Sequence, residues 1–435
     1  MACDAKLITL LFINFSVTSI YTAVVPFYPI IASDKGVNFI IIGAIIAIMP
    51  LVTFIVSPVL GKWMEKIGRH RSLLASIILA GSSLVIASVS LLCDTVLFIT
   101  LGFLFRIVAG LALALNNTAG YSILSSDYKD MFTKAVGLME MFTGLGIIVG
   151  PIITAALYTV IGPFWAFMVM AGLIYVTVIP AFFMLGKERP YVISSQIVQE
   201  RRGLLKDPVS PIQVVLADIT CLFVGLLGIG FTDLMLTSYI VSMGASTSTA
   251  AMVYILSCIT YAIASPIASY IPESVDRRFL IFLGNLLTFV SYYLIGTIPP
   301  APEQIWVVAI GVGVMGVALA MVIVSAYPHL LFYCSNVLGI PHDDILSDTI
   351  SSYAVAANGL GMVTGPIMSG ILVEFMSYEQ SLWVVAGMFL VLTPAYVCAT
   401  GYWRTLFCCE DKGHSKSYLK LQESGQSSRR PSVLR

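Results

Sequence analysis

The sequence is divided into twelve apolar runs, each long enough to cross a lipid bilayer as a helix. A bilayer core takes about 20 apolar residues in helical form, and its lack of water forces the backbone to satisfy its own hydrogen bonds. Hydrophobic residues make up 58% of the chain and charged residues only 11%, against roughly 25% charged residues in soluble domains. We therefore predict an all-α membrane protein with spans at Leu7–Ile31, Phe39–Leu60, Ser72–Cys93, Val96–Leu115, Thr133–Tyr158, Phe164–Leu185, Val214–Val241, Ala250–Ile271, Phe279–Ile298, Ile305–Tyr327, Ile350–Phe375 and Leu382–Tyr402.

The lysine and arginine residues predict the orientation of these spans. The two tails and the even-numbered loops hold 21 of the 23 Lys and Arg residues, the opposite side holds only Lys35, and Arg106 lies inside the fourth span. Because basic loops stay in the cytosol, we expect an integral multi-pass protein with both termini cytosolic. The chain also carries 23 acidic residues, and this balance gives no reason to expect a nucleic-acid partner.

The reactive residues indicate neither an enzyme nor a metalloprotein. The eight cysteines include no CxxC pair and no histidine at the spacing of zinc ligands. No nucleophile with a base, and no glycine-rich phosphate loop, stands on a membrane-facing segment. We therefore expect no catalysis, no cofactor and no metal, and a monomer in contact with the lipid bilayer.

The fifth and eleventh spans share a glycine and proline motif at an offset of 215 residues. This repeat predicts two pseudo-symmetric six-helix bundles in residues 1–186 and 214–403, with a cytosolic linker at 187–213 and a disordered tail at 404–435. Closely spaced glycines let helices approach, and proline removes a backbone hydrogen bond, so we expect kinked spans packed where the halves meet. Packing alone and a role in gating are equally open for Gly146, Gly150, Pro151, Gly361, Gly365 and Pro366.

The loop between spans two and three resembles the signature loop of the major facilitator superfamily, with Glu65 where that superfamily usually has aspartate. The resemblance implies that superfamily's fold, in which substrate binds between the two bundles near the membrane midplane. It also implies that the loop's basic side chains bond the cytosolic ends of spans and stabilise one access state, with Glu65 as their internal partner. The loop residues concerned are Gly61, Glu65, Lys66, Gly68, Arg69 and Arg71.

From about Tyr21 to Tyr402 the chain resembles the vesicular amine transporter group, and within it the vesicular polyamine branch. The resemblance implies proton-coupled exchange of an organic cation across a vesicle or other organelle membrane, with the plasma membrane as another possible location. The stretch Phe15–Thr18 lacks the acidic residue that monoamine carriers of the group keep in span one, so monoamines are not favoured. The matching stretches are 26–29 with 35–36, 137–146, 230–233, 261–266 and 282–286.

Three charged residues lie well away from the ends of predicted spans, where an unpaired charge costs at least ~2.5–3.5 kcal/mol. Spans four and five run in opposite directions, so Arg106 and Glu140 are expected to meet near mid-membrane as an ion pair. That pair is either a structural lock or a switch that opens when Glu140 is protonated. Asp233 in span seven is the expected ligand of a substrate cation, with capping of a helix kink or contact with a lumenal vestibule as the alternatives.

Five other residues near the predicted spans are also candidates for a role. Tyr21, Tyr239 and Tyr353 are candidate cation–π walls for the substrate, and each also fits ordinary packing. Asp218 is expected as a solvated acid near the start of span seven. His329, at the end of span ten, is either a titrating group or an ordinary packed side chain.

The sequence therefore favours a secondary transporter that exchanges protons for an organic cation such as a polyamine or another amine. Two other transport functions remain open, namely a drug-type exporter and a carrier of neutral or anionic solutes. A non-transporting membrane receptor or scaffold, in which the embedded charges only pair with one another, is the alternative from a different class.

Overall fold

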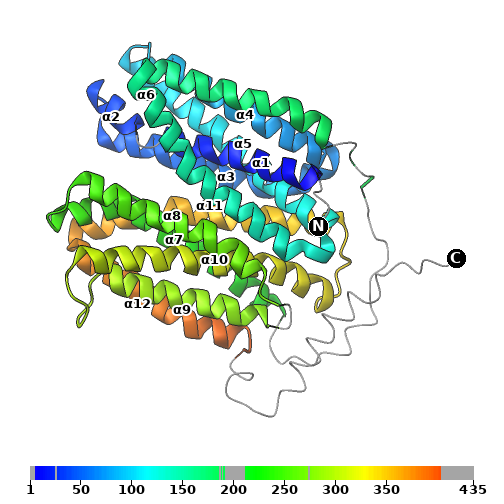
Figure 1. The fold of residues 1–435 in the computed structure, drawn as a ribbon. Helices are drawn as coiled ribbons and strands as arrows, with labels where there is room; N and C mark the ends of the chain where they lie inside the picture. Colours follow the sequence, from blue (N-terminus) through cyan, green and yellow to red (C-terminus); the bar gives the residue numbers. More distant parts are fainter. Residues whose placement is uncertain are drawn as a thin grey trace.

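The structure, a computed structural model, describes residues 5–24, 27–185, 188, 190–191, 211–272 and 275–402. The regular elements of these residues are helices, which confirms the predicted all-α architecture (Figure 1). In chain order they are α1 (Ala5–Ala23), α2 (Tyr28–Asp34), α3 (Phe39–Ile67), α4 (Arg69–Ser90), α5 (Thr95–Asp127), the short 3-10 helix η1 (Lys129–Met131), α6 (Phe132–Met184), α7 (Pro211–Ser242), α8 (Thr247–Ser269), α9 (Arg277–Ile295), α10 (Ile305–Asn336), α11 (Asp344–Phe375) and α12 (Tyr378–Ala399).

The helices account for the predicted membrane spans once α6 is divided. Within the described residues, ten helices are long and apolar enough to cross a membrane, and α1 is a shorter apolar helix. α6 is one continuous element, but Gly162 breaks its helical geometry with φ 78° and ψ 168°. A positive φ favours glycine because it has no Cβ. Dividing α6 into the arms 132–161 and 163–184 and including α1 gives the twelve spans.

Several spans begin or end where the sequence did not predict. The first run does not form one helix to Ile31, because α1 ends at Ala23 and a separate helix, α2, starts at Tyr28. Proline lacks a backbone donor, and Pro29 stands at the start of α2. α5 continues from the predicted end at Leu115 to Asp127, and α10 also extends beyond its predicted end. Residue depths in the membrane that were predicted by counting from the span ends are therefore shifted by these added turns.

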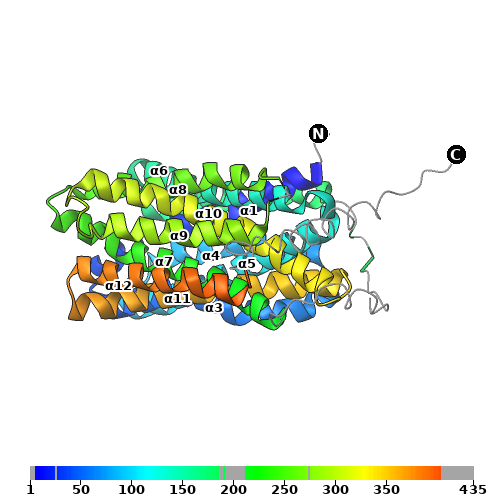
Figure 2. The ribbon, with the colours of Figure 1, turned by 90° about the horizontal axis from the view of Figure 1, so that it is seen from below.

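The helices form two bundles that meet along a restricted set of helices (Figure 1). Helices α1–α6 make the first bundle and α7–α12 the second, with α6 packed on α8 and α11 packed on α3 and α5 across the junction. Figure 2 shows these two contacts on opposite edges of the molecule, α6 with α8 along one edge and α3 with α11 along the other. We call the side where α1 and α7 begin the terminal side, and the opposite side the far side.

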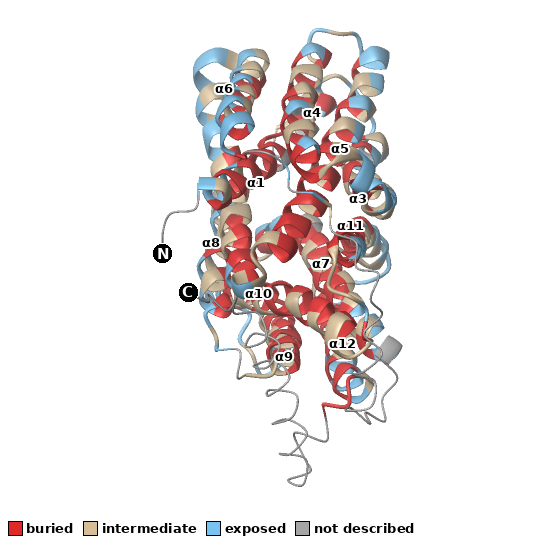
Figure 3. Cartoon of the chain, turned by 90° about the vertical axis from the view of Figure 1, so that its right-hand side faces the viewer, coloured by how far each residue is buried: buried red, intermediate tan, exposed pale blue. Residues whose placement is uncertain are grey.

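Apolar side chains cover the outside of both bundles. Figure 3 shows buried residues between the helices and exposed residues along the outer faces. The exposed residues include large apolar side chains such as Val160, Phe183 and Phe375, with 81%, 74% and 78% of their surface exposed. An apolar exterior of this kind suits hydrocarbon surroundings, since lipid tails do not penalise exposed apolar surface.

The helices that carry the repeated glycines lie where the halves meet, since α6 packs on α8 and α11 packs on α3 and α5. Four of these glycines pack each helix onto a neighbour in its own bundle. A Cβ on Gly146 or Gly150 would lie 2.8 Å from the Phe15 oxygen or 2.2 Å from the Ser19 oxygen of α1. Gly361 and Gly365 of α11 approach backbone oxygens of α7 in the same way, at 2.4 and 2.3 Å. The repeated motif therefore makes the same kind of helix contact in both bundles, α6 with α1 and α11 with α7. α6 and α11 continue as helices through Pro151 and Pro366.

Candidate functional site

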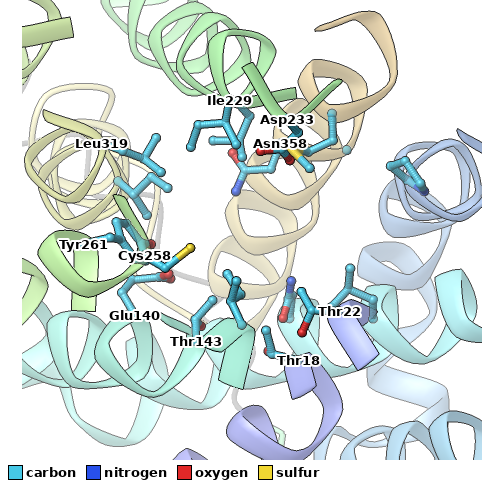
Figure 4. Close-up of a pocket in the computed structure, with 18 of the residues that line it drawn as sticks. Thr18, Thr22, Glu140, Thr143, Ile229, Asp233, Cys258, Tyr261, Leu319 and Asn358 are labelled. Atoms are coloured by element: carbon cyan, nitrogen blue, oxygen red, sulfur yellow. Dashed lines mark hydrogen bonds between the residues drawn. The ribbon is translucent and has the colours of Figure 1, made fainter. Parts of the chain in front are cut away.

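A cavity of about 210 Å³ lies between the two bundles, and both contribute to its walls. The first bundle supplies α1, α3, α5 and α6, and the second supplies α7, α8, α10 and α11. Figure 4 shows polar groups from both bundles around this space. Six of the polar lining residues are Thr18, Asn117, Glu140, Asp233, Tyr261 and Asn358.

Glu140 is held by two phenol groups, one from each bundle. Only 3% of the surface of this residue is exposed. Tyr121 of α5 donates a hydrogen bond to Oε1, and Tyr261 of α8 donates one to Oε2 at 2.5 Å. A hydrogen bond to an ionised carboxylate is about twice as strong as one between neutral groups. The Tyr261 bond therefore ties the second bundle to the first through Glu140.

Asp233 stands at another level of the same cavity. The side chain of Tyr254 on α8 hydrogen-bonds to it, while its Oδ1 atom is buried and has no hydrogen-bond partner within the described residues. A buried acceptor without a partner is costly, so this oxygen is suited to receive a donor from a ligand. Tyr254 and Tyr261 are seven residues apart on α8, which separates the levels of Asp233 and Glu140 by roughly 10 Å at helical rise.

Arg69 of the signature loop closes the terminal side by bonding to the other bundle. This side chain is only 7% exposed. Its Nη1 lies 2.8 Å from Asp344 Oδ1, and its Nε lies 2.9 Å from Asp348 Oδ1, both on α11. Removing one member of a buried ion pair is strongly destabilising, because it leaves the other charge uncompensated.

The start of the connection between the bundles reinforces this closure. The Tyr191 hydroxyl donates to Asp348 at 2.5 Å, and the Arg69 guanidinium lies 5.3 Å from the centre of the Tyr191 ring. Partial burial and the hydrogen bond to the Asp348 carboxylate raise the pKa of Tyr191, so this phenol stays a neutral donor. Glu188 accepts a hydrogen bond from the Arg69 backbone nitrogen. Of the predicted linker 187–213, the structure describes residues 188, 190, 191 and 211–213, the last three as the start of α7. The rest of the linker and the whole predicted tail lie outside the described residues.

The other residues of the signature loop divide into close-packed glycines and exposed charges. A Cβ on Gly61 would lie 2.3 Å from Ser352 Oγ of α11, and Gly68 begins α4 with φ 88°. Glu65, Lys66 and Arg71 are exposed. Their expected bonds to span ends, and the role of Glu65 as internal partner, are not found in the described part of the chain. Arg69 alone of the loop's charges reaches α11.

The predicted ion pair between Arg106 and Glu140 is wrong. Arg106 donates to Met49 Sδ at 3.7 Å and lies with its guanidinium 5.1 Å from the Phe105 ring centre. Glu140 instead meets α5 at Tyr121, fifteen residues further along that helix, which is roughly 22 Å at helical rise. The added length of α5 toward the terminal side explains the error in depth. Arg106 does not line the cavity.

Two of the three candidate aromatic walls lie away from the cavity. Tyr239 is buried in the second bundle with its hydroxyl 3.3 Å from Thr297. It follows Asp233 by six residues, which turns it about 240° around α7 at roughly 100° per residue. Tyr353 is 48% exposed on the outside of α11. The side chain of Tyr21 lies outside the described part of the structure.

Asp218 and His329 form a buried pair, which corrects the expectation of a solvated acid. The His329 Nδ1 atom lies 2.5 Å from Asp218 Oδ2, and the Tyr396 hydroxyl donates to Oδ1 at 3.0 Å. Because α7 already begins at Pro211, Asp218 lies two turns inside the helix and not at its exposed end. All three side chains belong to the second bundle and none lines the cavity.

Sequence reasoning missed the residues that join the bundles. Asp344 and Asp348 lie four residues apart in the first turns of α11, and this spacing on one helix face was the available signal. The predicted span began only at Ile350. Tyr121 and Tyr261 carry no comparable signal, because the chain has 20 tyrosines. No group of three or more potential metal ligands occurs within the described residues.

The sequence pattern of the Major Facilitator Superfamily matches residues 10–339, which is more than half of the chain. The chain belongs to the major facilitator superfamily. This confirms the predicted fold and makes the chain a membrane transporter of that superfamily. Because a transporter's substrate passes between the two bundles, the cavity with Glu140 and Asp233 is its candidate substrate site.

Individual relatives agree with this assignment. The MFS-type transporter SLC18B1 of Mus musculus is 26% identical over 382 residues, which cover 84% of this chain and 80% of that protein. The Homo sapiens protein of the same name is 26% identical over 385 residues, covering 86% and 82%. The tetracycline resistance protein, class E, of Escherichia coli is 26% identical over 180 residues, covering 40% and 42%.

A solved structure supports the fold alone. The human organic anion transporter MFSD10 (TETRAN) superposes with a TM-score of 0.66 at 15% identity, covering 91% of this chain and all of that one. At this identity the likeness carries no argument about substrate charge.

Proposed function

We propose that this transporter exchanges protons for an organic cation of the amine or polyamine class. The observation that supports this is the charge of the cavity, whose lining residues include Glu140 and Asp233 but, within the described part of the chain, neither lysine nor arginine. Two carboxylates without a basic neighbour attract cations and repel anions. The same groups bind protons, so protons and cationic substrate compete for one site.

The spacing of the two carboxylates favours an extended substrate with more than one charge. The levels of Asp233 and Glu140 differ by roughly 10 Å along α8. A polyamine carries ammonium groups separated by several methylene units, and the apolar side chains that also line the cavity, such as Leu226, Ile229 and Leu319, suit those methylenes. The unpartnered Asp233 Oδ1 supplies an acceptor for an ammonium N–H.

We propose further that the terminal side faces the cytosol and that the far side faces the lumen of a vesicle or another organelle. The distribution of Lys and Arg supports this orientation. The Arg69 contacts then close the cytosolic side. In such a cycle Glu140 and Asp233 take up protons from an acidic lumen. When they release these protons to the cytosol, both carboxylates are charged and can bind the cation.

The test is uptake by proteoliposomes that contain the purified full-length chain. Radiolabelled spermidine is the polyamine probe, and tetraethylammonium is a singly charged probe of similar class. With an acidic interior, we expect spermidine accumulation that collapses when a proton ionophore is added. Asp233→Asn should raise the KM for spermidine roughly 10- to 100-fold, because it removes a charged hydrogen-bond partner.

The control for charge is Glu374→Gln, which removes an exposed acid on α11 outside the cavity and should leave the KM unchanged. Uptake that persists after the gradient is collapsed would overturn proton coupling. Preferential transport of anions or neutral solutes would favour the other carrier functions. Absence of flux for every solute class would favour a receptor or scaffold.

A further inference from the structure

We propose that the hydrogen bond from Tyr261 to Glu140 couples the protonation of Glu140 to closure of the terminal side, which makes Tyr261 a positioning residue for proton exchange. The inference rests on the proposed proton-coupled function and adds to it how the proton moves the bundles. The sequence had assigned this coupling to Arg106, which lies elsewhere.

The geometry gives Glu140 two matched donors that differ only in the bundle they come from. Tyr121 is on α5, in the same bundle as Glu140, whereas Tyr261 is on α8 in the second bundle. Losing the Tyr121 bond therefore changes one bundle internally. Losing the Tyr261 bond removes a link between bundles.

The backbone around this bond shows that it lies in the contact that must open. A Cβ on Gly144 would lie 2.9 Å from Ala262 Cβ, and one on Gly137 would lie 2.3 Å from Ser269 Cβ. Gly144 lies on the cavity side of Glu140 and Gly137 on its terminal side, so α8 packs closely on α6 both above and below the level of Glu140. Separation of the bundles on that side pulls α8 from α6 and breaks the Tyr261 bond.

Protonation weakens this bond for a simple electrostatic reason. The ionised carboxylate accepts both phenol O–H groups in charge-assisted bonds, while a protonated carboxyl is neutral and uses one oxygen to carry its own hydrogen. The titratable groups facing Glu140 are Tyr121 from α5, Tyr261 from α8 and Tyr327 from α10, whose ring stacks on that of Tyr121. The described groups around Glu140 are thus neutral phenols, so the charge of Glu140 itself sets the strength of the contact.

The sign of this coupling suits exchange. A proton that reaches Glu140 from the cavity weakens closure of the terminal side, and the loaded protein opens there and releases it. Loss of the proton restores the charged acceptor, which serves the cation while the terminal side is open and accepts the Tyr261 bond again when the bundles close. Glu140 thus carries the proton, and its protonation weakens the hydrogen bond to the second bundle.

The test measures the distance between the bundles on the terminal side without substrate. Spin labels are placed at Lys66→Cys and Ile345→Cys, two exposed positions on opposite bundles, in the full chain with its eight native cysteines replaced. Pulsed electron paramagnetic resonance in lipid nanodiscs then gives distance distributions at neutral and at mildly acidic pH, about 7.5 and about 5.5.

We expect acid to raise the ratio of long to short distances about tenfold in the parent protein, the usual scale for losing a charge-assisted bond. Tyr261→Phe should show the long distances at both pH values, and Tyr121→Phe should keep the response to pH. Glu140→Gln, which imitates the neutral carboxyl, should match Tyr261→Phe and gives a second route to the same state.

A response to pH that is unchanged in Tyr261→Phe or Glu140→Gln would overturn the proposal, as would an equal loss of response in Tyr121→Phe. Because substrate is absent, these outcomes leave proton-driven amine uptake to be judged separately. Loss of spermidine uptake in a protein that keeps the distance response would count against the proposed function and not against this coupling.

Discussion

Replacing Arg69 with methionine tests whether the ion pairs to α11 hold the terminal side closed. Methionine keeps the length and apolar stem of the side chain but removes the guanidinium. The change leaves Asp344 and Asp348, with 2% and 1% of their side chains exposed, without the cation that lies 2.8 and 2.9 Å away. Breaking a buried pair in this way costs roughly 3–5 kcal/mol.

This free-energy cost destabilises the closed state and not the open state. The ion pairs join different bundles, and water reaches both carboxylates when the bundles separate. At about 1.4 kcal/mol per factor of ten, the ratio of closed to open protein should fall by roughly two to three and a half orders of magnitude. Hydrogen exchange with mass spectrometry measures this change through the backbone amides of residues 344–352 and 60–68. Exchange there should accelerate in Arg69→Met.

The neighbouring Arg71→Met is the matched control, since Arg71 carries the same charge on the same helix but is exposed. Adding Asp344→Asn and Asp348→Asn to Arg69→Met should recover part of the protection, because no buried charge is then left uncompensated. Exchange in Arg69→Met that equals exchange in Arg71→Met would refute the reasoning that these ion pairs close the terminal side.

Three further predictions concern stability, measured by thermal unfolding in detergent. Gly365→Ala should destabilise the protein by about 1–3 kcal/mol by overpacking, since its Cβ would lie 2.3 Å from a backbone oxygen of α7, whereas Gly370→Ala on the same helix meets nothing within 4 Å and should be neutral or slightly stabilising; equal effects would contradict this. Although burial raises the pKa of Asp276, the charge and hydrogen bonds of Arg278 lower it and hold it below its usual range. The stability lost in Asp276→Asn should therefore be full above about pH 4 and should shrink as pH falls below that value. A loss that grows on acidification would be evidence against this ion pair. His329→Ala should cost about 3–5 kcal/mol if its buried pair with the α7 carboxylate is ionic, and about 1–3 kcal/mol if it is neutral; an unchanged midpoint would show that the pair contributes nothing.

Much of the fold was predictable because lipid imposes a local rule on the sequence. Each span must be apolar over about 20 residues, and that requirement is visible in any single stretch of the chain. The signature loop and the repeated glycines are also local patterns, and they pointed to the superfamily before any contact was known. Glu140 and Asp233 were identified for the same reason, since a charge inside an apolar run stands out.

The partners of those residues were not predictable, because depth errors accumulate along a helix. Extending α5 by twelve residues beyond Leu115 moves its terminal end by roughly 18 Å, which is enough to exchange Arg106 for Tyr121 as the neighbour of Glu140. Asp218 illustrates the same effect, since a start of α7 at Pro211 turned an expected solvated acid into the buried partner of His329.

The sequence alone determined that this chain crosses the membrane many times, in two related halves, with acids embedded in the spans. Only the tertiary structure decided which side chains meet across the halves, namely Glu140 with Tyr261 and Arg69 with Asp348. The physical reason is that hydrophobicity is a property of each segment, whereas a contact between residues more than a hundred positions apart depends on the rotation and depth of two helices at once. A helix turns about 100° per residue, so a shift of one or two residues replaces one partner by another.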